Sequence, residues 1–314
     1  MELARQHNCS FHELAIQPAQ WNVGNPKECR DFFSIAEKDA FKDVLWIRKP
    51  AGAFHGRGIT IHKGSEGLRK KTNCDGKGNQ AIVMRYINDT VLMGGHKFDM
   101  RTYLLIASTK PFLVFYHDGF IRRSQKKYTS ASSLKDKNVH ITNAGSQSSK
   151  NHFFSFEQLQ DRLTAEHGFD PLFMDNAFRP WAKAVTNFLF HSAMLSPKVR
   201  LDRENGRFQL FALDWMVDQK GGVHLLEANG YPSTQKYPSN IGLTPGVFVS
   251  MLELVNTIHT RGGSMRVQDS FRHKRWHLVY NEAEVAAAKR EYDPCRIREY
   301  VASADPLFSF KSKV

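Results

Sequence analysis

The sequence predicts an α+β protein whose strands carry the unusual polar residues. Helical and strand-like hydrophobic patterns both occur along the chain, and its 314 residues, 41% hydrophobic and 24% charged, suffice for one large core or two smaller ones. Strand patterns dominate the stretches in which charged residues stand between apolar ones. No apolar run approaches the roughly 20 residues of a membrane-spanning helix, so no membrane contact is expected.

The charge and the cysteines narrow the class of protein. A net charge of +13 favours an acidic partner, which can be nucleic acid, an anionic membrane surface or an acidic protein segment. The first residues lack the apolar core of a secretory signal, and a cytoplasmic location is therefore expected. The cysteines lack the spacing of a metal site or a disulfide framework, so we expect reduced thiols at Cys9, Cys29, Cys74 and Cys295.

The N-terminal half is expected to consist of short strands with one helix and a glycine-rich loop among them. PFLVFYHDGFIRR predicts a hairpin that turns at Asp118-Gly119. In chain order, the elements before it are the helix PKECRDFFSIAEKDAF, the strand DVLWIRKP, the loop AGAFHGRGITIHKG, and the strands QAIVMRYI and GGHKFDMRTYLLI.

The C-terminal half alternates between helix and strand. The pattern predicts helix from about 155 to 194, with interruptions at Gly168 and Pro171, and strands again at 208–230. The next helix, TPGVFVSMLELVNTIHT, starts near Pro245 with Thr244 suited to its N-cap. The last fifty residues carry the basic cluster FRHKRWH and a helical pattern in NEAEVAAAKREY.

The strand GGHKFDMRTYLLI places three charges on one face. Because strand side chains alternate between faces, Lys97, Asp99 and Arg101 share one side while Phe98 and Met100 take the other. Desolvating three charges on a core strand is costly. The face is therefore either a surface salt-bridge ladder, which would be worth little, or the wall of a ligand cleft.

The hairpin at 208–230 brings two carboxylates together. If 219–222 form a four-residue loop, Asp218 pairs with Val223, Asp214 lies opposite Glu227, and Asn229 follows on the same face. Paired carboxylates repel unless a cation lies between them, and Mg²⁺ prefers such oxygen ligands together with nucleotide phosphates. A solvated hairpin face is the alternative, although the apolar flanking residues indicate that the hairpin lies on a core.

The glycine-rich loop could approach phosphates. Glycines at 52, 56 and 58 allow close approach of backbone N–H groups, and Lys49 and Arg57 add positive charge. No Gly-Lys-Ser/Thr opens a helix here, so the loop is not a Walker sequence, and a loop of this kind is more often only a turn. Together with the hairpin and the charged strand, however, it favours a magnesium–nucleotide site.

These motifs, in this order, resemble the tubulin–tyrosine ligase-like family of ATP-grasp ligases. The resemblance runs from about Trp46 to Pro232 and covers over half the chain. It rests on the ordered blocks WIRKPAGAFHGRGI, MRYINDTVLMGGHKFDMRTYLLI, YHDGFIRRSQKKY, VHITNAGSQ, FQLFALDWMVD and HLLEANGYPS.

The resemblance implies an ATP-grasp fold, in which two α+β lobes hold the nucleotide between antiparallel sheets. It implies an N-terminal leader at 1–44, reduced relative to the N-terminal domain of the family, a ligase core at 45–262, and a basic, helical C-terminal extension at 263–314. The residues implied to bind ATP are Lys49, Gly56, Arg57, Gly58, Arg85, Tyr86, Ile87, Lys97, Asp99, Thr142 and Asn143.

The resemblance also implies the reaction. A tubulin carboxylate attacks the γ-phosphate of ATP to form an acyl phosphate, and the amine of an amino acid, tyrosine or glutamate, then displaces phosphate. Asp214, Glu227 and Asn229 are implied to bind Mg²⁺, or Mn²⁺ in its place. Arg101 and Arg122 are implied catalytic residues, and Arg122 and Tyr128 would face the substrate.

The implied partners are tubulin, through its acidic C-terminal tail, and a free amino acid. The charge of +13 suits such a tail, and the cytoskeleton or the cilium becomes the expected location within the cytoplasm. Met84 stands where the family usually has Gln, and His55 where a phosphate-facing Lys or Arg is usual.

Two other hypotheses stay open on the sequence. Those two departures and the reduced N-terminal segment support a catalytically degenerate ATP-grasp protein that binds tubulin or microtubules without ligation. A nucleic-acid-binding module using FRHKRWH and IRRSQKKY rests on charge alone, and is disfavoured because no recognised nucleic-acid motif accompanies these basic runs.

Overall fold

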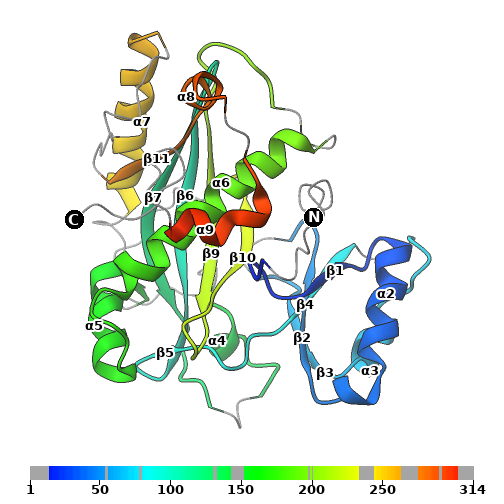
Figure 1. Ribbon diagram of the computed structural model, residues 1–314. Coiled ribbons are helices and arrows are strands. Elements are labelled where there is room, and N and C mark those ends of the chain that lie inside the picture. The colour runs from blue at the N-terminus through cyan, green and yellow to red at the C-terminus, as the bar shows by residue number, and fades with distance from the viewer. Residues whose placement is uncertain are drawn as a thin grey trace.

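The computed structural model consists of two lobes, each built on an antiparallel sheet (Figure 1). No helix among the described residues is long and apolar enough to cross a bilayer. The structure describes residues 14–53, 56–77, 80–129, 133–142, 152–196, 199, 201–232, 244–262, 275–289 and 292–302.

The small lobe is a four-stranded sheet covered on one face by helix α2 (Pro26–Ala36). Asn25 caps this helix by accepting hydrogen bonds from two backbone N–H groups of its first turn, and Phe32 and Phe33 bury themselves against Trp46 of the sheet. In spatial order the strands are β1 (Gln20–Asn22), β4 (Ala81–Arg85), β2 (Leu45–Pro50) and β3 (Thr60–Lys63), with the short helices η1 (Asp39–Phe41) and α3 (Glu66–Arg69) beside them.

The expectation of reduced thiols is wrong for the described cysteines. Cys29 on α2 and Cys74 after α3 form a disulfide with their Cα atoms 5.4 Å apart, and Cys295 is also disulfide-bonded. The packing of α2 on the sheet brings Cys29 and Cys74 together across 45 residues of sequence, so no local spacing could indicate the pair.

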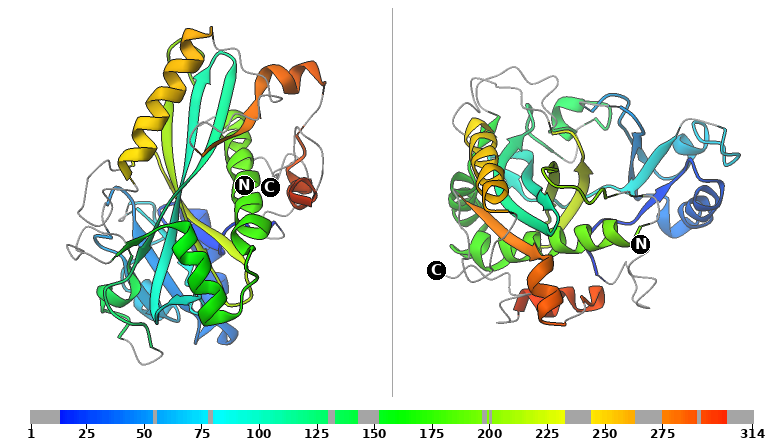
Figure 2. Two further views of the ribbon diagram at one scale, coloured as in Figure 1. Left: turned by 90° about the vertical axis from the view of Figure 1, so that its left-hand side faces the viewer. Right: turned by 90° about the horizontal axis from the view of Figure 1, so that it is seen from above.

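The large lobe is built on a seven-stranded sheet with helices on both faces (Figure 2). The expected hairpin at 208–230 is present, and strands from outside 45–262 join both sheets: β1 pairs with β4 and β11 with β7. The strands are β10 (Val223–Asn229), β9 (Gln209–Val217), β6 (His96–Thr109), β7 (Phe112–Arg123) and β11 (Trp276–Asn281), with β5 (Leu92–Met93) on β6 and β8 (Phe153–Phe154) on β7.

The helices of the large lobe form two layers. One layer is α7 (Thr244–Thr260), which packs on one face of the sheet. On the other face, α5 starts at a capping box between Ser155 and Gln158. It ends at Gly168, which has the left-handed conformation, and this confirms the interruption predicted there from the sequence. That layer contains α5 (Phe156–His167), the π-helical turn η3 (Met174–Phe178), α6 (Arg179–Leu195), α8 (Glu282–Ala287), η6 (Pro294–Arg296) and α9 (Ile297–Ala302); α4 (Lys137–His140) lies apart, near the small lobe.

The alternation predicted for β6 explains where the charged residues lie. Phe98 and Met100 are buried in the core beneath α5 and α6. On the opposite face, Tyr103 and the alternate β6 residues after it are covered by α7, whereas Lys97, Asp99 and Arg101 continue this face toward the pocket between the lobes. The three charges therefore occupy the stretch of the face that α7 does not cover.

The predicted hairpin at Asp118-Gly119 is wrong. β7 is one strand from Phe112 to Arg123, and the turn that joins it to β6 lies at Lys110-Pro111. Gly119 is instead the extra residue of a β-bulge, since Arg101 pairs with Phe120 and Thr102 with Asp118. A bulge and a turn use the same residue types, which is why the sequence pattern misled.

Replacing Gly119 with Ala is expected to destabilise the large lobe. A Cβ atom at this position would lie 2.5 Å from the backbone oxygen of Arg101, which cannot move without breaking the pairing of β6 with β7. We expect a loss of about 2 kcal/mol or more in the free energy of unfolding, measured with urea. Gly246→Ala is the control, because no atom lies within 4 Å of its added Cβ; equal stability of the two variants would contradict this prediction.

Candidate functional site

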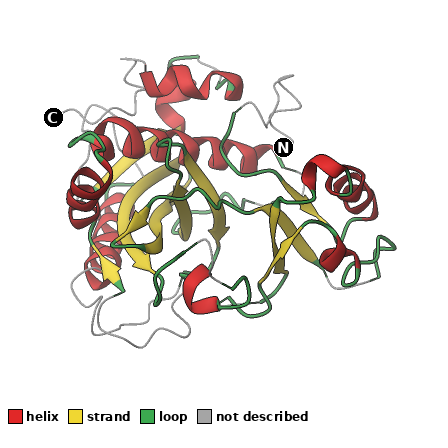
Figure 3. Ribbon diagram, turned by 90° about the horizontal axis from the view of Figure 1, so that it is seen from below, coloured by secondary structure: helices red, strands yellow, loops and turns green. Residues whose placement is uncertain are grey.

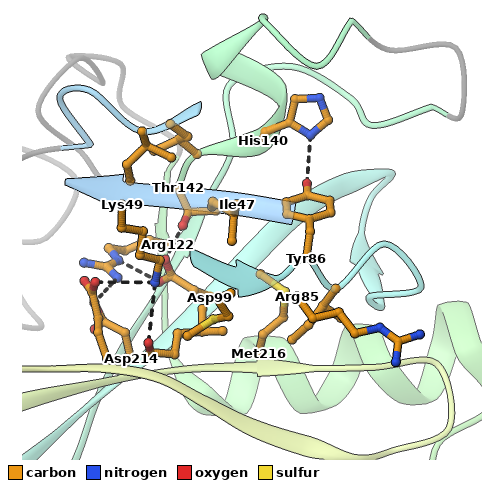
Figure 4. Close-up of a pocket in the computed structure, with 16 residues that line it drawn as sticks. Ile47, Lys49, Arg85, Tyr86, Asp99, Arg122, His140, Thr142, Asp214 and Met216 are labelled. Carbon is orange, nitrogen blue, oxygen red and sulfur yellow. Dashed lines mark hydrogen bonds and ion pairs between the residues drawn. The ribbon is translucent and has the colours of Figure 1, made fainter. Parts of the chain in front are cut away.

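A pocket lies between the two sheets (Figure 4). Figure 3 shows the ribbons of these two sheets next to each other. It holds about 640 Å³ of unfilled space, some of it open to solvent. The small lobe contributes β2, β4 and the residues after it, and the large lobe contributes β6, β7, β9 and β10. The lining residues are Ile47, Lys49, Ile59, Met84, Arg85, Tyr86, Ile87, Asp99, Arg122, His140, Ile141, Thr142, Asp214, Met216, Leu226 and Glu227.

The acidic hairpin has the predicted pairing but not the predicted register. Val223 pairs with Val217 rather than with Asp218, so the strands start one residue out of the expected register. A bulge between Leu225 and Glu227 corrects this shift, and Glu227 then lies opposite Asp214 as predicted. Asp218 instead closes the turn, because its carboxylate accepts hydrogen bonds from the N–H groups of Lys220 and Gly222.

Two buried aspartates, Asp99 and Asp214, and two arginines, Arg101 and Arg122, form the centre of the site. Figure 4 labels both aspartates and Arg122. Arg122 donates from Nε to Asp99 at 2.6 Å and from Nη2 to Asp214 at 2.8 Å. Arg101 donates to both oxygens of Asp214, at 2.8 and 2.9 Å, and the Thr142 hydroxyl donates to Asp99. The two arginines oppose the charges of the two carboxylates, which allows Asp99, Asp214 and Arg122 to be buried. Burial nevertheless raises the pKa of Asp99 above its usual value, against the opposing effect of Arg122.

The electrostatics keep Asp214 ionised. Its burial opposes the charged form, but the guanidinium groups of Arg101 and Arg122 outweigh this and hold the pKa of Asp214 well below its usual range. Burial also opposes the charge of Arg122, yet Asp214 and Asp99 raise the pKa of Arg122 above its usual value. Asp214 therefore presents a carboxylate at any physiological pH.

The residues predicted to bind Mg²⁺ do gather at one place. Asn229 Nδ2 lies 3.2 Å from Glu227 Oε1 and 3.4 Å from Asp214 Oδ2, so all three side chains converge. Two carboxylates and an amide are the hard oxygen ligands that suit Mg²⁺ when phosphates complete the shell. No group of three or more His, Cys, Asp or Glu side chains placed for a metal occurs in the described part of the chain. The donor set thus fits a nucleotide-bound ion.

Lys49 and the glycine loop border the same end of the pocket. Lys49 Nζ lies 3.6 Å from Glu227 Oε2 and 3.4 Å from the backbone oxygen of Leu226. Gly56 and Gly58 have φ values of 69° and 70°, a conformation that favours glycine. A Cβ atom on Gly56 would lie 2.9 Å from the side chain of Ile141, next to Thr142. Gly56 therefore lies against Ile141, a lining residue of the pocket, while the contact of the loop with a phosphate stays a prediction.

Lys97 is fully buried behind the pocket rather than lining it. Its Nζ donates to the backbone oxygen of Ile87 at 2.9 Å and lies 4.0 Å from the ring centre of Tyr86 and 4.7 Å from that of Tyr128. Burial, offset in part by Asp89, lowers the pKa of Lys97 to about 7. Lys97 thus holds the segment predicted to border adenine.

Replacing Lys97 with Met is expected to change how stability depends on pH. The folded-state pKa of Lys97, about 7, lies below the ordinary value of 10.5. The buried charge of Lys97 therefore destabilises the fold fully below pH 7, and this destabilisation disappears as the pH rises from 7 to 10.5. In this window the free energy of unfolding of the wild type should rise relative to the variant by about 1.4 kcal/mol per pH unit. Urea denaturation measures the difference, with Lys38→Met as an exposed control; a constant difference across the window would contradict the prediction.

The structure brings most of the predicted site residues together. Arg101 and Asn229 do not line the pocket but bond to Asp214 at its edge. Tyr128 lies beside Lys97 and His140 rather than beside Arg122, so its substrate contact stays a prediction, as does the phosphate contact of the exposed Arg57. Asn143, His55 and most of the FRHKRWH cluster lie outside the described residues.

Several lining residues were not predicted. Nδ1 of His140 and the hydroxyl of Tyr86 form a hydrogen bond of 2.8 Å, which joins the two lobes (Figure 4). Ile47 and Met216 form apolar walls of the pocket. Strand alternation would have found both, since Ile47 stands two residues from Lys49 and Met216 two residues from Asp214.

The sequence is similar to a known protein family and to several of its members. A family model described as "Tubulin-tyrosine ligase family" matches residues 2–262. "Inactive polyglycylase TTLL10" of Homo sapiens is 28% identical over 92% of this chain and 47% of its own length. "Protein polyglycylase TTLL10" of Mus musculus is 27% identical over 84% of this chain and 40% of its own. "Probable tubulin polyglutamylase ttll-9" of Caenorhabditis elegans is 28% identical over 61% and 46%. The chain thus spans about half the length of these relatives or less.

Proposed function

The chain belongs to the tubulin–tyrosine ligase family, and we propose from this membership and its site that it is an ATP- and Mg²⁺-dependent ligase that attaches an amino acid to a carboxylate of tubulin. The observation that carries the proposal is the convergence of Asp214, Glu227, Lys49 and Arg122 in one pocket between two sheets, with Asn229 at its edge. The names of the relatives, which include a tubulin polyglutamylase, support tubulin as the acceptor.

In the proposed reaction the residues of this chain position the reactants and balance charge. The acceptor carboxylate attacks the γ-phosphorus of ATP, which forms an acyl phosphate and releases ADP. The amine of the amino acid then attacks the acyl carbon, so an amide bond forms, phosphate leaves, and the amine loses a proton to solvent. No protein nucleophile takes part, and positioning and electrostatic stabilisation lower the barrier.

The proposed roles follow the geometry of the pocket. Asp214, Glu227 and Asn229 would hold Mg²⁺, which supplies positive charge against the triphosphate. Lys49 and the backbone of the glycine loop would contact the phosphates, while the segment 85–87, held by Lys97, would border the base. Arg101 and Arg122, which both bond to Asp214, would lie next to the transferred group and stabilise its developing negative charge.

For the amino acid, we propose glutamate. The sequence favours tyrosine or glutamate, whereas the relatives reported above are named as polyglycylases and a polyglutamylase. Glutamate is the amino acid that the sequence resemblance and the names of the relatives have in common. Action on tubulin would also place the protein at the cytoskeleton.

The test is incorporation of a labelled amino acid into tubulin. The protein is incubated with ATP, Mg²⁺ and purified tubulin, and with labelled glutamate, tyrosine or glycine in separate reactions. We expect label in tubulin with glutamate, and none when ATP is omitted. Label with tyrosine or glycine alone would overturn the choice of amino acid but not the ligase.

A second candidate is a protein of this family that binds tubulin without ligation. Met84, where the family usually has Gln, is a buried lining residue and provides no amide to the pocket, and one relative is named inactive. This candidate predicts co-sedimentation with microtubules and no incorporation of any of the three labels.

A further inference from the structure

The bulge at Gly119 decides which face of the sheet carries Arg122. Up to Tyr116, the even-numbered residues of β7 pack in the core beneath α5 and α6. An unbroken period of two would place Arg122 on this same face. Because Gly119 is an extra residue, the alternation shifts by one, so Ile121 lies in that core and Arg122 lines the pocket (Figure 4).

A network of hydrogen bonds fixes Asp118, the residue before the bulge. Asp118 is buried, and its carboxylate accepts hydrogen bonds from the Tyr116 hydroxyl and from Arg179 Nε, both at 2.6 Å. Arg179 is the first residue of α6 and donates from Nη1 to Asp175 of η3, also at 2.6 Å. Burial opposes the charge of Asp118, but Arg179 and the Tyr116 hydroxyl outweigh this and hold the pKa of Asp118 below its usual value. Turning Asp118 away from α6 would therefore break both hydrogen bonds and the ion pair.

Arg122 is fixed by a second network on the opposite face of the sheet. It donates to both aspartates of the site, so positions 118 and 122, four residues apart, are each held by buried ion pairs. The backbone between them is tightly packed, because a Cβ atom added to Gly119 would lie 2.5 Å from the backbone oxygen of Arg101. A displacement of Asp118 should therefore reach Arg122 instead of being absorbed by the bulge.

Stability alone does not account for the ion pair of Asp118 with Arg179. The even-numbered β7 residues before Asp118 belong to the apolar core, and apolar residues in place of a buried ion pair are often neutral or stabilising. The turn that precedes Arg179, η3, is π-helical, and such turns occur frequently at functional sites. Both observations indicate that this pair places other residues.

We propose that Arg179 is a positioning residue: through Asp118 it fixes the bulge at Gly119 and so holds Arg122 in the orientation that the ligase reaction requires, an inference that rests on the proposed function. Arg179 does not line the pocket. Its loss should therefore slow the chemical step, in which Arg122 is proposed to act, and leave the binding of ATP nearly unchanged.

The kinetic test compares two substitutions of Arg179. Arg179→Gln removes the charge that pairs with Asp118, whereas Arg179→Lys keeps it. We expect kcat for amino-acid incorporation to fall about a hundredfold in Arg179→Gln, with KM for ATP within about twofold of the wild type. Arg179→Lys should recover part of kcat, because a cation still faces Asp118. A kcat of Arg179→Gln equal to that of the wild type would overturn the inference.

The matched control is a variant that loses stability in the same core without touching the network. Leu163→Ala removes a side chain of α5 that is 1% exposed, and the cavity it leaves destabilises the large lobe. All variants are assayed at a temperature at which circular dichroism shows them folded. We expect kcat of Leu163→Ala to stay within about twofold of the wild type. Equal falls in Leu163→Ala and Arg179→Gln would show that Arg179 has only a structural role.

A second measurement reports the position of Arg122 without any need for catalysis. In protein with ¹⁵N-labelled arginine, the Nε–H of Arg122 should exchange slowly with water, because it is donated to buried Asp99 at 2.6 Å. Its NMR signal is identified by its loss in Arg122→Lys. We expect exchange of this proton to be at least about tenfold faster in Arg179→Gln and unchanged in Leu163→Ala. Equal exchange in the wild type and Arg179→Gln would overturn the inference.

The two measurements separate this inference from the proposed function. If the wild type incorporates no amino acid, the proposed function fails, and the exchange of the Arg122 proton alone decides whether Arg179 positions Arg122. If Arg179→Gln does not fold, Tyr116→Phe takes its place, since it removes only one hydrogen bond to Asp118 and keeps the ring. We then expect a smaller acceleration of exchange, and no acceleration would overturn the inference.

Discussion

Glu227→Gln is expected to abolish ligase turnover while the fold stays intact. The side chain is 33% exposed, and its amide counterpart keeps the shape and can still accept the hydrogen bond from Asn229. The change removes one of the two negative ligands proposed for Mg²⁺ and the ion pair with Lys49. We expect a loss of at least about a thousandfold in the rate of amino-acid incorporation, which corresponds to about 4 kcal/mol of transition-state stabilisation.

The controls for this variant are stability and a remote carboxylate. The midpoint of thermal unfolding should shift by no more than a few degrees, since no buried contact is lost. Glu66→Gln changes an exposed glutamate of α3 and should leave the rate unchanged. Equal turnover of Glu227→Gln and the wild type would refute the assignment of the metal site.

Arg122→Leu is expected to be the most destabilising single change in the site. Arg122 lies between Asp99 and Asp214, and all three side chains are no more than 5% exposed. Leucine would leave Asp99 without an ion pair and Asp214 with only Arg101. Breaking a buried ion pair in this way costs about 3–5 kcal/mol, to be measured as the free energy of unfolding in urea.

Two further measurements distinguish lost charge balance from lost packing. Adding Asp99→Asn to Arg122→Leu should recover part of the stability, because the amide no longer needs a counter-charge. Lowering the pH toward the range in which carboxylates protonate should also reduce the difference in free energy of unfolding between the variant and the wild type. Arg162→Leu, which breaks an exposed pair with Glu166, should cost less than about 1 kcal/mol. If neither Asp99→Asn nor a lower pH reduces this difference, the stability lost in Arg122→Leu comes from packing and not from charge.

The sequence predicted the site best where strand alternation applies. The charged face of β6 follows from a period of two, and the apolar residues between the charges are buried as expected. The same rule placed Asp214 opposite Glu227, although the actual register reaches this pairing through a bulge. Two errors cancelled here, because the true turn is one residue longer than assumed and the bulge adds one residue in compensation.

The sequence failed where distant segments decide the structure. Nothing local distinguishes the bulge at Gly119 from a hairpin turn; the close approach of Arg101 from the neighbouring strand makes the difference. The disulfide of Cys29 with Cys74 and the contact of Tyr86 with His140 likewise depend on how separate segments pack. A second cavity, lined by β3 and by the segment around α4, needs walls from two lobes, so neither segment indicates it alone.

The most direct test of the account is a crystal structure with Mn²⁺ and a non-hydrolysable ATP analogue bound. Anomalous scattering locates Mn²⁺ without reference to the chain. We predict a single strong peak among the oxygens of Asp214, Glu227 and Asn229, with the triphosphate of the analogue between Lys49 and Arg122. A peak remote from these carboxylates, or an analogue bound outside the pocket between the sheets, would contradict the account.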